Sequence, residues 1–528
     1  MARDQGVSEF SDLRPKEKCG IIGCAGTSPI TSDLYYGLRI LQHRGQESAG
    51  LAVFDDGGLK AKRGMGLVHE VFTKEDLLEL RGNSGIGHVR YSTTGSSVLD
   101  NAQPIVAKTS YGEIALAHNG DIANANEIRE ELSKKGWAFM TTSDSEVIVR
   151  LLANEIVNTG DIKRALREFT SRLVGAYSLA LMINDTVYAI RDPLAIRPLC
   201  LGEGDGRMMI ASESVVFDTL PGYKFIRDLK PGEIVELRSD GFESMRLPHP
   251  NHTAHCMFEW VYFARPDSVL DDRLVYDARV KIGEQLAHEH PVPADIVVPV
   301  PESGRAQAQG YAHVSGLPVV EGLIKNRYIE RTFIMPDQAD RETGVMLKLN
   351  AIRSAVKNKR VVLIDDSIVR GTTIRKIVGI LRLAGAREVH VRIGCLPIRF
   401  PCYLGIDMKT RDQFIANEKT VPEIAEFIRA DSVGYLSLRG LISALKHSRD
   451  DICLGCLTGE YPVPIPGEKM RKEKPLEMFS DSASKPDGKK KAGSRIRPVG
   501  SSFVPSESSR EPSGTPRKKS ARGASRPD

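Results

Sequence analysis

VVLIDDSIVRGTT, residues 361–373, is the stretch that determines the fold class of the second half of the chain. Its apolar start predicts a buried strand, and the loop that follows leads into a helical segment that continues through Gly385 to another apolar run. Strand, helix and strand in this order predict a βαβ unit and therefore a parallel sheet. Residues 294–312, ADIVVPVPESGRAQAQGYA, have the same order of strand, loop and helix. We therefore predict an α/β fold for this half.

Two carboxylates end the predicted strand. Asp365 and Asp366 would be unpaired charges in a core, so they must face solvent, a cation or a polyol. The segment from Ser367 to Thr373 combines small residues, a glycine and hydroxyls just before a helix, which is typical of a phosphate cradle. The alternative is an ordinary turn with a solvated acidic pair. A Walker-type nucleotide loop is excluded because no GxxxxGK[ST] occurs.

The first half predicts a mostly antiparallel α+β structure. Strands are expected at residues 50–56, 85–92 and 113–120, with hairpins around Asn184-Asp185 and within residues 201–214. Two helices are also expected. One begins behind a Thr31/Ser32 cap, and the other begins at Ser143, with Glu146 at the spacing of a capping box. The antiparallel and parallel halves are expected to meet near residues 240–256.

Length and composition restrict the class of protein. A chain of 528 residues with 41% apolar and 27% charged residues is expected to form at least two globular domains. No apolar run approaches the roughly 18–20 residues of a membrane helix. The first eighteen residues are charged and lack the apolar core of a secretory signal. Eight scattered cysteines do not form a secreted disulfide pattern, so we expect a reducing, cytoplasmic location.

The C-terminal tail has a different composition from the rest of the chain. Residues 470–528 contain 15 Lys and Arg against 7 Asp and Glu, although the whole chain has a net charge of only +5. The remainder is therefore slightly acidic and gives no reason to expect a nucleic-acid-binding body. The tail is rich in Ser, Pro, Gly and Lys, and we expect residues 467–528 to be disordered.

Polar side chains cluster in several short stretches of the first half. Cys19 heads the apolar run in EKCGIIGCAG, and further motifs follow it: HRGQES at 43–48, HVRYSTTG at 88–95, HNGDI at 118–122 and TSDSE at 142–146. Each has an ordinary structural explanation. Asn119-Gly120 could be a turn, Asp144 a helix start, Arg90 half of a surface ion pair, and Cys19 a core residue. Their combination needs a common explanation.

In this order, the motifs resemble the class II glutamine amidotransferase domain over about 230 residues. This resemblance implies the αββα sandwich of an N-terminal nucleophile hydrolase, in which the cysteine becomes the first residue and its own α-amino group is the base. An α-amine with pKa near ~8 beside a thiol with pKa near ~8.5 can share a proton at neutral pH. Residues 1–18 would then be a propeptide whose removal exposes the amine of Cys19.

The resemblance also implies roles for individual residues. Cys19 would attack the side-chain amide carbon of glutamine, and the Asn119 side chain with the Gly120 backbone N–H would stabilise the oxyanion. Arg90 would hold the α-carboxylate of glutamine and Asp144 its α-ammonium. The products would be glutamate and ammonia.

Residues 361–373 resemble the phosphoribosyl-pyrophosphate motif of type I phosphoribosyltransferases. This resemblance implies that Asp365 and Asp366 bind the ribose hydroxyls and, with Ser303, help to place Mg²⁺. The 5-phosphate would be held by the cradle, which consists of Ser367, Val369, Arg370, Gly371, Thr372 and Thr373. Residues 325–350 look like the loop that closes over the substrate. Its cations suited to pyrophosphate are Lys325, Arg327, Arg331 and Lys348.

The remaining cysteines leave the type of metal site open. Cys453 and Cys456 form a CxxC motif that could be a zinc half-site, a redox pair or chance. The chain resembles the iron-sulfur-containing branch of the amidophosphoribosyltransferase family, which implies a [4Fe-4S] cluster on Cys256, Cys402, Cys453 and Cys456. Three further cysteines are interpreted as core residues or bystanders, namely Cys24, Cys200 and Cys395. Cys395 and Leu396 depart from the small polar residue and proline usual in relatives, which makes the geometry near Cys402 harder to predict.

The resemblance to that family covers residues 19–466. It implies a glutamine amidotransferase domain at 19–250 and a phosphoribosyltransferase domain with a cluster-binding segment at 251–466. Ammonia from glutamine would displace pyrophosphate from phosphoribosyl pyrophosphate to give 5-phosphoribosylamine, the opening step of purine synthesis. Purine nucleotides would act as feedback inhibitors of a homotetramer. One alternative, a sugar-phosphate aminating enzyme, would need an isomerase domain instead of residues 361–373. The other is a regulatory protein that binds nucleic acid through its tail.

Overall fold

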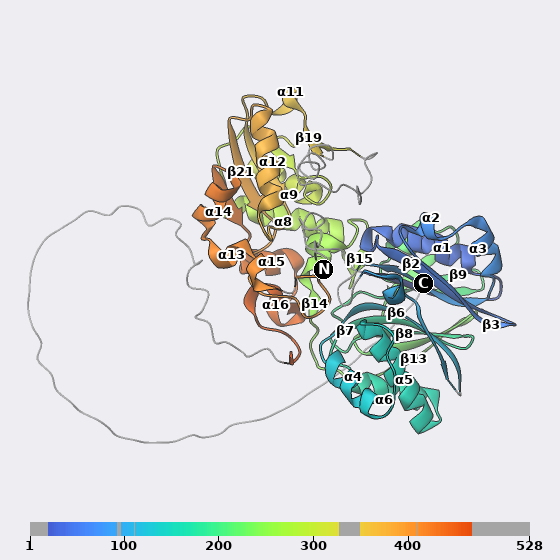
Figure 1. The fold of residues 1–528 in the computed structure, drawn as a ribbon. Helices are drawn as coiled ribbons and strands as arrows, with labels where there is room; N and C mark the ends of the chain where they lie inside the picture. Colours follow the sequence, from blue (N-terminus) through green and yellow to red (C-terminus); the bar gives the residue numbers. More distant parts are fainter. Residues whose placement is uncertain (1–18, 92–96, 110, 327–348, 409, 467–528) are drawn as a thin grey trace, which may run out of the picture. The chain divides into compact units, whose positions relative to one another are not determined.

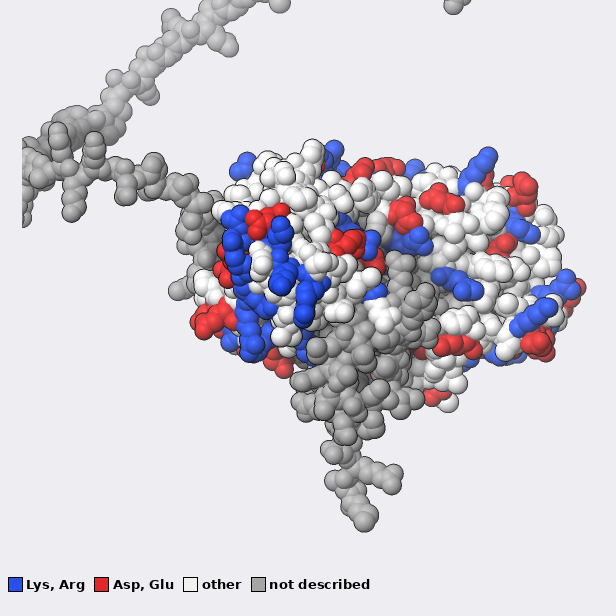
Figure 2. All heavy atoms as spheres, turned by 90° about the horizontal axis from the view of Figure 1, so that it is seen from above, with Lys and Arg blue, Asp and Glu red and all other residues white. Residues whose placement is uncertain are grey.

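The computed structural model describes residues 19–91, 97–109, 111–326, 349–408 and 410–466, all within one structural unit of the chain. The predicted propeptide and the basic tail therefore lie outside the described residues. None of the helices in the described ranges combines the length and hydrophobicity that crossing a membrane requires. Figure 2 shows side chains of both charge signs interspersed over much of one face, with a denser group of Lys and Arg at one end.

Two antiparallel sheets form the first half (Figure 1), as predicted. In the described part, the first sheet has seven strands, in the order β11 (Lys224–Asp228), β9 (Cys200–Gly204), β10 (Arg207–Ala211), β1 (Gly20–Gly26), β4 (Ser84–Arg90), β2 (Ser48–Asp55) and β3 (Gly58–Met65). The described strands of the second sheet are β13 (Gly241–Arg246), β12 (Glu233–Arg238), β8 (Thr186–Arg191), β7 (Gly175–Ile183), β6 (Gly112–Ile122) and β5 (Ile105–Thr109).

Helices cover the outer faces of both sheets. The helices beside the first sheet are α1 (Thr31–Ile40), α2 (Val68–Val71), α3 (Lys74–Glu79) and α7 (Val215–Thr219), with a 3₁₀ turn η1 at Leu41–Arg44. Those beside the second sheet are α4 (Ala125–Lys134), α5 (Asp144–Thr159) and α6 (Ile162–Arg172). The 3₁₀ turn η2 (Leu99–Asn101) precedes β5. The layers follow the αββα order that the resemblance implies.

Alternation along β1 explains these layers. Ile22 and Cys24 belong to the apolar cluster beneath α1, whereas Ile21 and Ala25 belong to the cluster between the two sheets. A strand buried on both faces is apolar at every position, which is why the run after Cys19 has no polar residue. The cluster between the sheets includes many alanines, which are Ala52, Ala115, Ala117, Ala180 and Ala189. These small side chains allow the sheets to pack closely.

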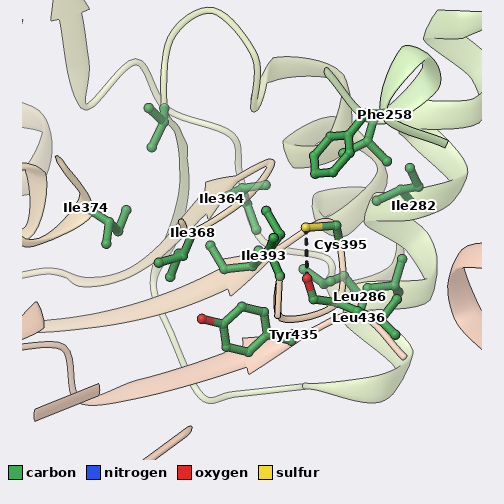
Figure 3. Close-up of a cluster of buried hydrophobic side chains, with 14 of the residues drawn as sticks. Phe258, Ile282, Leu286, Ile364, Ile368, Ile374, Ile393, Cys395, Tyr435 and Leu436 are labelled. Atoms are coloured by element: carbon green, nitrogen blue, oxygen red, sulfur yellow. Dashed lines mark hydrogen bonds between the residues drawn. The ribbon is translucent and has the colours of Figure 1, made fainter. Parts of the chain in front are cut away.

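A parallel sheet organises the second half, which confirms the prediction from residues 361–373. Its described strands, in spatial order, are β17 (Ile296–Pro299), β20 (Arg360–Asp365), β21 (Glu388–Ile393) and β22 (Ser432–Tyr435). The longer helices of this half are α8 (Val275–Glu289), α9 (Arg305–Ser315), α12 (Thr372–Leu383), α14 (Val421–Ile428) and α15 (Leu438–Leu445). Figure 3 shows how Ile364 and Ile393 from adjacent strands meet Ile282 and Leu286 of α8 in the core.

Short elements complete the second half. The strand pairs are β14 (His255–Cys256) with β23 (Ile452–Cys453), β15 (Val269–Leu270) with β16 (Arg273–Leu274), and β18 (Leu323–Lys325) with β19 (Leu349–Ala351). The short helices are the π-helix η3 (Glu259–Phe263), α11 (Arg353–Val356), η4 (Arg411–Gln413), α13 (Ile415–Glu418), η5 (Arg449–Asp451) and α16 (Gly455–Thr458). The last strand of the second sheet ends at Arg246 and β14 begins at His255, within the range predicted for the change of fold.

Two predicted helix caps are wrong in detail. Thr31 lies inside α1, with Ile30 at the N-cap, and its hydroxyl donates to the carbonyl of Leu80. Ser143 does cap α5 by accepting a hydrogen bond from the backbone N–H of Ser145. The reciprocal half of the capping box is not formed, because the Glu146 carboxylate accepts from the backbone N–H groups of residues 140 and 141. Both helices are present, but Thr31 is used by a tertiary contact and Glu146 by the segment that precedes its helix.

A pair of glycine substitutions tests the packing of α1. Alanine favours an exposed helix interior by about 0.8–1.0 kcal/mol relative to glycine. A methyl group at Gly37, however, would lie 2.1 Å from Cδ1 of the buried Ile22. Overpacking of this kind costs about 1–3 kcal/mol, so we expect Gly37→Ala to lower the thermal midpoint. A methyl group at Gly379 in α12 would have no atom within 4 Å outside its chain neighbours and the local helix backbone, so Gly379→Ala should raise the thermal midpoint. Equal shifts in thermal unfolding scans would contradict this packing.

Candidate functional site

Cys19 lies buried immediately before β1. Its thiol donates a hydrogen bond of 3.5 Å to the backbone carbonyl of Tyr91. Burial raises the pKa of this thiol to about 11, while the charge of Arg90 acts to lower it and those of Asp144 and Glu47 act to raise it. The structure therefore brings Arg90 and Asp144 into the electrostatic environment of Cys19, although they come from β4 and α5. Because the thiol is neutral near pH 7, it needs a base to become a nucleophile.

Asn119 and Gly120 lie near the end of β6. The amide nitrogen Nδ2 of Asn119 is buried and has no hydrogen-bond partner among the described residues. Leaving a buried donor unpaired costs about 1–3 kcal/mol, so such groups are commonly reserved for a ligand or an intermediate. Gly120 has no room for a side chain, because a methyl group there would lie 1.9 Å from the carbonyl oxygen of Ala176. Packing therefore requires glycine at this position.

Asp144 is the first residue of α5 and is held by the neighbouring strand. Its Oδ2 accepts a hydrogen bond of 3.1 Å from the backbone N–H of Ile122, at the end of β6. His118 Nδ1 lies 3.6 Å from the same oxygen, but burial lowers the pKa of His118, so this contact does not pair two full charges. Asp144 therefore lies, like Arg90, in the electrostatic environment of Cys19.

Arg44 lies in the HRGQES stretch, but its sequence context did not predict that it contacts Cys19. Its Nε donates to the carbonyl oxygen of Cys19 at 3.1 Å, and its Nη1 and Nη2 donate to Glu259 at 3.1 and 3.0 Å. Nη1 also donates to Glu213. Burial acts to lower the pKa of Arg44, but Glu259 and Glu213 together raise it above its ordinary value. Arg44 is almost completely buried, and the spacing of residues in the motif does not indicate this burial.

A second site lies where β17 and β20 end. Asp365 and Asp366 are both buried. Oδ1 of Asp365 accepts hydrogen bonds from the backbone N–H of Asp366 at 3.0 Å and from the Ser303 hydroxyl at 3.4 Å. The Ser367 hydroxyl donates to Asp366 Oδ2 at 2.6 Å. The structure thus brings Ser303 and the two aspartates together, since parallel strands end at the same edge of the sheet.

The predicted phosphate cradle leads into α12. Gly371 is the N-cap residue, with a left-handed φ of 76°, and Thr372 begins the helix. A methyl group at Gly371 would also lie 2.8 Å from Cδ1 of Ile415, so both conformation and space favour glycine. Within the cradle, Val369 is buried, whereas Thr372 is exposed. The N-terminus of a twelve-residue helix directs its backbone N–H groups toward this loop.

The predicted closing loop is only partly described. Lys325 ends β18, is exposed, and pairs in register with Leu349 of β19, so two short strands join the ends of the loop. Asn326 is described, but Arg327, Arg331 and Lys348 lie outside the described residues. The structure therefore describes the two strands at the ends of this loop. The roles proposed for its cations in binding pyrophosphate stay predictions.

Three chain segments bring four cysteines together. Cys256 of β14 pairs in register with Cys453 of β23. The carbonyl of Cys456 accepts hydrogen bonds from the backbone N–H groups of Arg399 and Phe400, two positions before Cys402. Burial raises the pKa of Cys456 well above its usual value, and the charges of Cys402, Cys453 and Cys256 raise it further. Within the described ranges, no three His, Cys, Asp or Glu side chains are grouped as ligands of a single metal ion.

The other three cysteines pack in the core, in agreement with their interpretation. Cys24 and Cys200 belong to the cluster beneath α1, and Cys24 Sγ lies 3.8 Å from the Tyr223 hydroxyl. Cys395 follows β21 and its thiol donates to the carbonyl of Leu396 at 3.2 Å (Figure 3). Burial is the main cause of its raised pKa, and the charges of Asp366 and Asp365 raise it further. Cys395 is therefore a buried neighbour of the aspartate pair.

Together, the αββα layers and the parallel-sheet domain define a glutamine amidotransferase joined to a phosphoribosyltransferase. Residues 88–219 match the family model described as a glutamine amidotransferase domain. The amidophosphoribosyltransferase of Methanothermobacter thermautotrophicus is 50% identical over 457 residues, covering 86% of this chain and 96% of that protein. The chain belongs to the amidophosphoribosyltransferase family, glutamine-dependent transferases that catalyse the first step of purine biosynthesis.

Further relatives support this assignment over nearly their whole length. The amidophosphoribosyltransferase of Bacillus subtilis is 42% identical and covers 85% of this chain and 95% of its own. A solved structure of glutamine phosphoribosylpyrophosphate amidotransferase from B. subtilis, complexed with ADP and GMP, superposes with a TM-score of 0.79 at 41% identity. It covers 85% of this chain and 98% of its own. The two-domain arrangement is therefore that of the family.

Proposed function

We propose that glutamine is hydrolysed at Cys19 and that its ammonia reacts with phosphoribosyl pyrophosphate beside Asp365 and Asp366. The unpartnered Nδ2 of Asn119 is the observation that carries the first assignment. A buried donor without a partner suits an oxyanion that exists only during reaction. We further propose a domain organisation of 19–250 for the amidotransferase, 251–466 for the transferase and 467–528 for the tail.

The glutaminase steps follow from the neutral thiol. Once residues 1–18 are removed as a propeptide, the α-amino group of Cys19 accepts the thiol proton as sulfur attacks the amide carbon. Asn119 Nδ2 and the backbone N–H of Gly120 donate to the resulting oxyanion. The protonated amine then gives its proton to the departing nitrogen, which leaves as ammonia. Water hydrolyses the thioester to glutamate and restores the thiol.

Two charged side chains orient the substrate in this proposal. Arg90 donates to the α-carboxylate of glutamine, and Asp144 accepts from its α-ammonium. Support comes from the position of both residues in the electrostatic environment of Cys19. The backbone N–H of Ile122 donates to Oδ2 of Asp144 and the Ser143 hydroxyl donates to Oδ1 at 3.5 Å, so both oxygens are oriented within the fold.

In the transferase site, we propose that Asp365 and Asp366 bind the 2- and 3-hydroxyls of ribose. The cradle from Ser367 to Thr373 holds the 5-phosphate with backbone N–H groups, and Lys325, Arg327 and Lys348 approach the pyrophosphate. The carboxylates of Asp365 and Asp366 with the Ser303 hydroxyl provide the oxygen ligands that Mg²⁺ prefers, and the bound ion would neutralise pyrophosphate charge. Ammonia attacks C1, and the C1–O bond to pyrophosphate breaks, which gives 5-phosphoribosylamine.

We also propose a [4Fe-4S] cluster on Cys256, Cys402, Cys453 and Cys456. The thiolates of a tetrahedral zinc site lie about 3.8 Å apart, since each Zn–S bond is about 2.3 Å. In an iron-sulfur cluster each thiolate binds a different iron atom, so the four sulfurs lie further apart. Cys256, Cys402 and Cys456 are buried and Cys453 is partly buried, and the electrostatic influence of the other three on Cys456 supports one shared site. Bound there, it would link β14, β23 and the segment around Cys402.

The proposed regulation is supported by a solved relative. The solved B. subtilis enzyme is complexed with ADP and GMP, which supports purine nucleotides as feedback inhibitors of this chain. We propose a cytoplasmic homotetramer.

Cys19→Ala tests the separation of the two chemistries. We expect glutamine-dependent synthesis to fall to background because the nucleophile is lost. Synthesis from free ammonia should remain within about twofold, because Asp365 and Asp366 lie in a different domain. Steady-state rates with glutamine and with ammonium salts measure both. If a folded variant loses both activities, the assignment of two separate sites is incorrect.

Asp365→Asn and Asp366→Asn test the transferase site. Removal of a charged hydrogen-bonding group costs about 1.5–3 kcal/mol, so we expect the ammonia-dependent rate to fall roughly 10- to 100-fold. Glutamine hydrolysis should persist. Asp431→Asn is the matched control, because Asp431 pairs with Arg382 away from these carboxylates. Unchanged transferase rates in both variants would remove the aspartates from the site.

Iron analysis tests the cluster independently of activity. Protein purified without oxygen should contain about four irons per chain. Cys453→Ser should lower the iron content and the thermal midpoint together, because metal binding stabilises the folded state. Cys24→Ser, in the core beneath α1, should leave iron unchanged. Stoichiometric zinc without iron would overturn the cluster and leave the enzyme assignment intact.

A further inference from the structure

The loop that follows Cys402 contacts the first half of the chain. The backbone N–H of Cys402 donates to the carbonyl of Met408 at 2.8 Å, and the N–H of Met408 donates to that of Ile406, also at 2.8 Å. Leu404, Ile406 and Met408 are 2%, 1% and 1% exposed. The loop 402–408 is therefore hydrogen-bonded at its ends and anchored by buried side chains.

Gly405, in the middle of this loop, packs on the backbone of Gly120. A methyl group at Gly405 would lie 3.0 Å from the carbonyl carbon of Gly120 and 3.2 Å from its Cα. Gly405 also has a φ of +100°, which side chains rarely tolerate. Both the positive φ and the tight contacts disfavour a side chain, so the loop lies close against the backbone of Gly120.

A buried arginine holds the loop in this position. Arg197 is 0% exposed, and its Nη2 donates to the carbonyl of Leu404, directly before Gly405. Its Nη1 lies 3.6 Å from Glu259 Oε1. The same oxygen accepts from Arg44 Nη2, and Arg44 Nε donates to the carbonyl of Cys19. The loop and the nucleophile thus share one buried ionic network.

We infer that Gly405 and Arg197 are positioning residues for glutamine hydrolysis: the loop 402–408 holds Gly120, and with it Asn119, where the oxyanion forms. This inference rests on the proposed oxyanion role of Asn119 and Gly120. Loss of one oxyanion donor typically costs ~10²–10³ in rate, and productive geometry must be kept within roughly 0.5 Å. The glutaminase site is therefore completed by a loop of the transferase half and is not contained in the amidotransferase half alone.

Gly405→Ala is the direct test. The new methyl group must displace Gly120, the loop or the Arg197 guanidinium, whose Nη2 would lie 2.9 Å away. We expect kcat for glutamine hydrolysis to fall roughly 10- to 100-fold, since only transition-state contacts are lost. KM for glutamine should stay within about twofold, because Arg90 and Asp144 do not move. The ammonia-dependent rate and the iron content should also be unchanged.

Three further variants make the outcome decisive. Gly385→Ala has comparable backbone strain, with φ +95° and only the Lys357 side chain nearby, and should leave kcat unchanged. If Gly405→Ala does not fold, Arg197→Lys provides the test, because lysine keeps the charge but cannot span both Leu404 and Glu259. It should show the same change in kcat without a change in KM. Asn119→Ala checks the proposed function separately and should lower kcat about 10²-fold or more.

The results distinguish the two proposals. An unchanged kcat in folded Gly405→Ala, with Asn119→Ala impaired, overturns the positioning role alone. Equal losses of glutaminase activity, ammonia-dependent activity and iron also overturn it, because the loop would then only support the fold. Full activity in Asn119→Ala overturns the oxyanion assignment itself.

Discussion

The buried pair between Arg44 and Glu259 is the interaction on which the rest of the glutaminase site depends. It joins η1, in the first half of the chain, to the π-helix η3 in the second half, with Glu213 as a second buried carboxylate. Removal of one partner from an isolated buried pair costs about 3–5 kcal/mol, and here Glu213 and Arg197 partly compensate the charge that remains. The same guanidinium also donates to the carbonyl of Cys19, so this ionic contact between the two halves helps to position the proposed nucleophile.

Local patterns predicted most of the fold. Residues 361–373 gave the βαβ unit because a strand, a glycine-containing loop and a helix follow one another without interruption, and the hairpin at Asn184-Asp185 is equally local. The Ser143 cap is formed, whereas the Thr31 cap and the Glu146 half of the capping box are not, because other contacts compete for these side chains. Thr31 donates to Leu80, 49 residues away, and the Glu146 carboxylate binds the segment that precedes the helix. Such competition is not visible in a spacing rule.

The residues of the candidate site likewise fall into two groups: those that local motifs could predict and those that only long-range contacts bring together. Cys19, Asn119 and the Asp365–Asp366 pair stand in short motifs whose chemistry can be interpreted from adjacent residues. Arg197 and Glu259 do not, since the contact from Arg197 reaches Leu404 across 207 positions and that from Arg44 reaches Glu259 across 215. A buried arginine in a sequence is indistinguishable from an exposed one. Only the folded chain reveals that these side chains act through one another.

This long-range arrangement has a chemical reason. Ammonia formed by one domain is useful only while the other can consume it, because free ammonia becomes protonated in water and is then no longer a nucleophile. A glutaminase site that was complete within its own domain would release ammonia regardless of the state of the transferase. Here the segment that begins at Gly394, which donates to the carbonyl of Asp365, continues through Cys402 to the contact of Gly405 with Gly120. One continuous stretch of backbone therefore connects the carboxylates of the proposed transferase site to Gly120, the glycine proposed to bind the oxyanion.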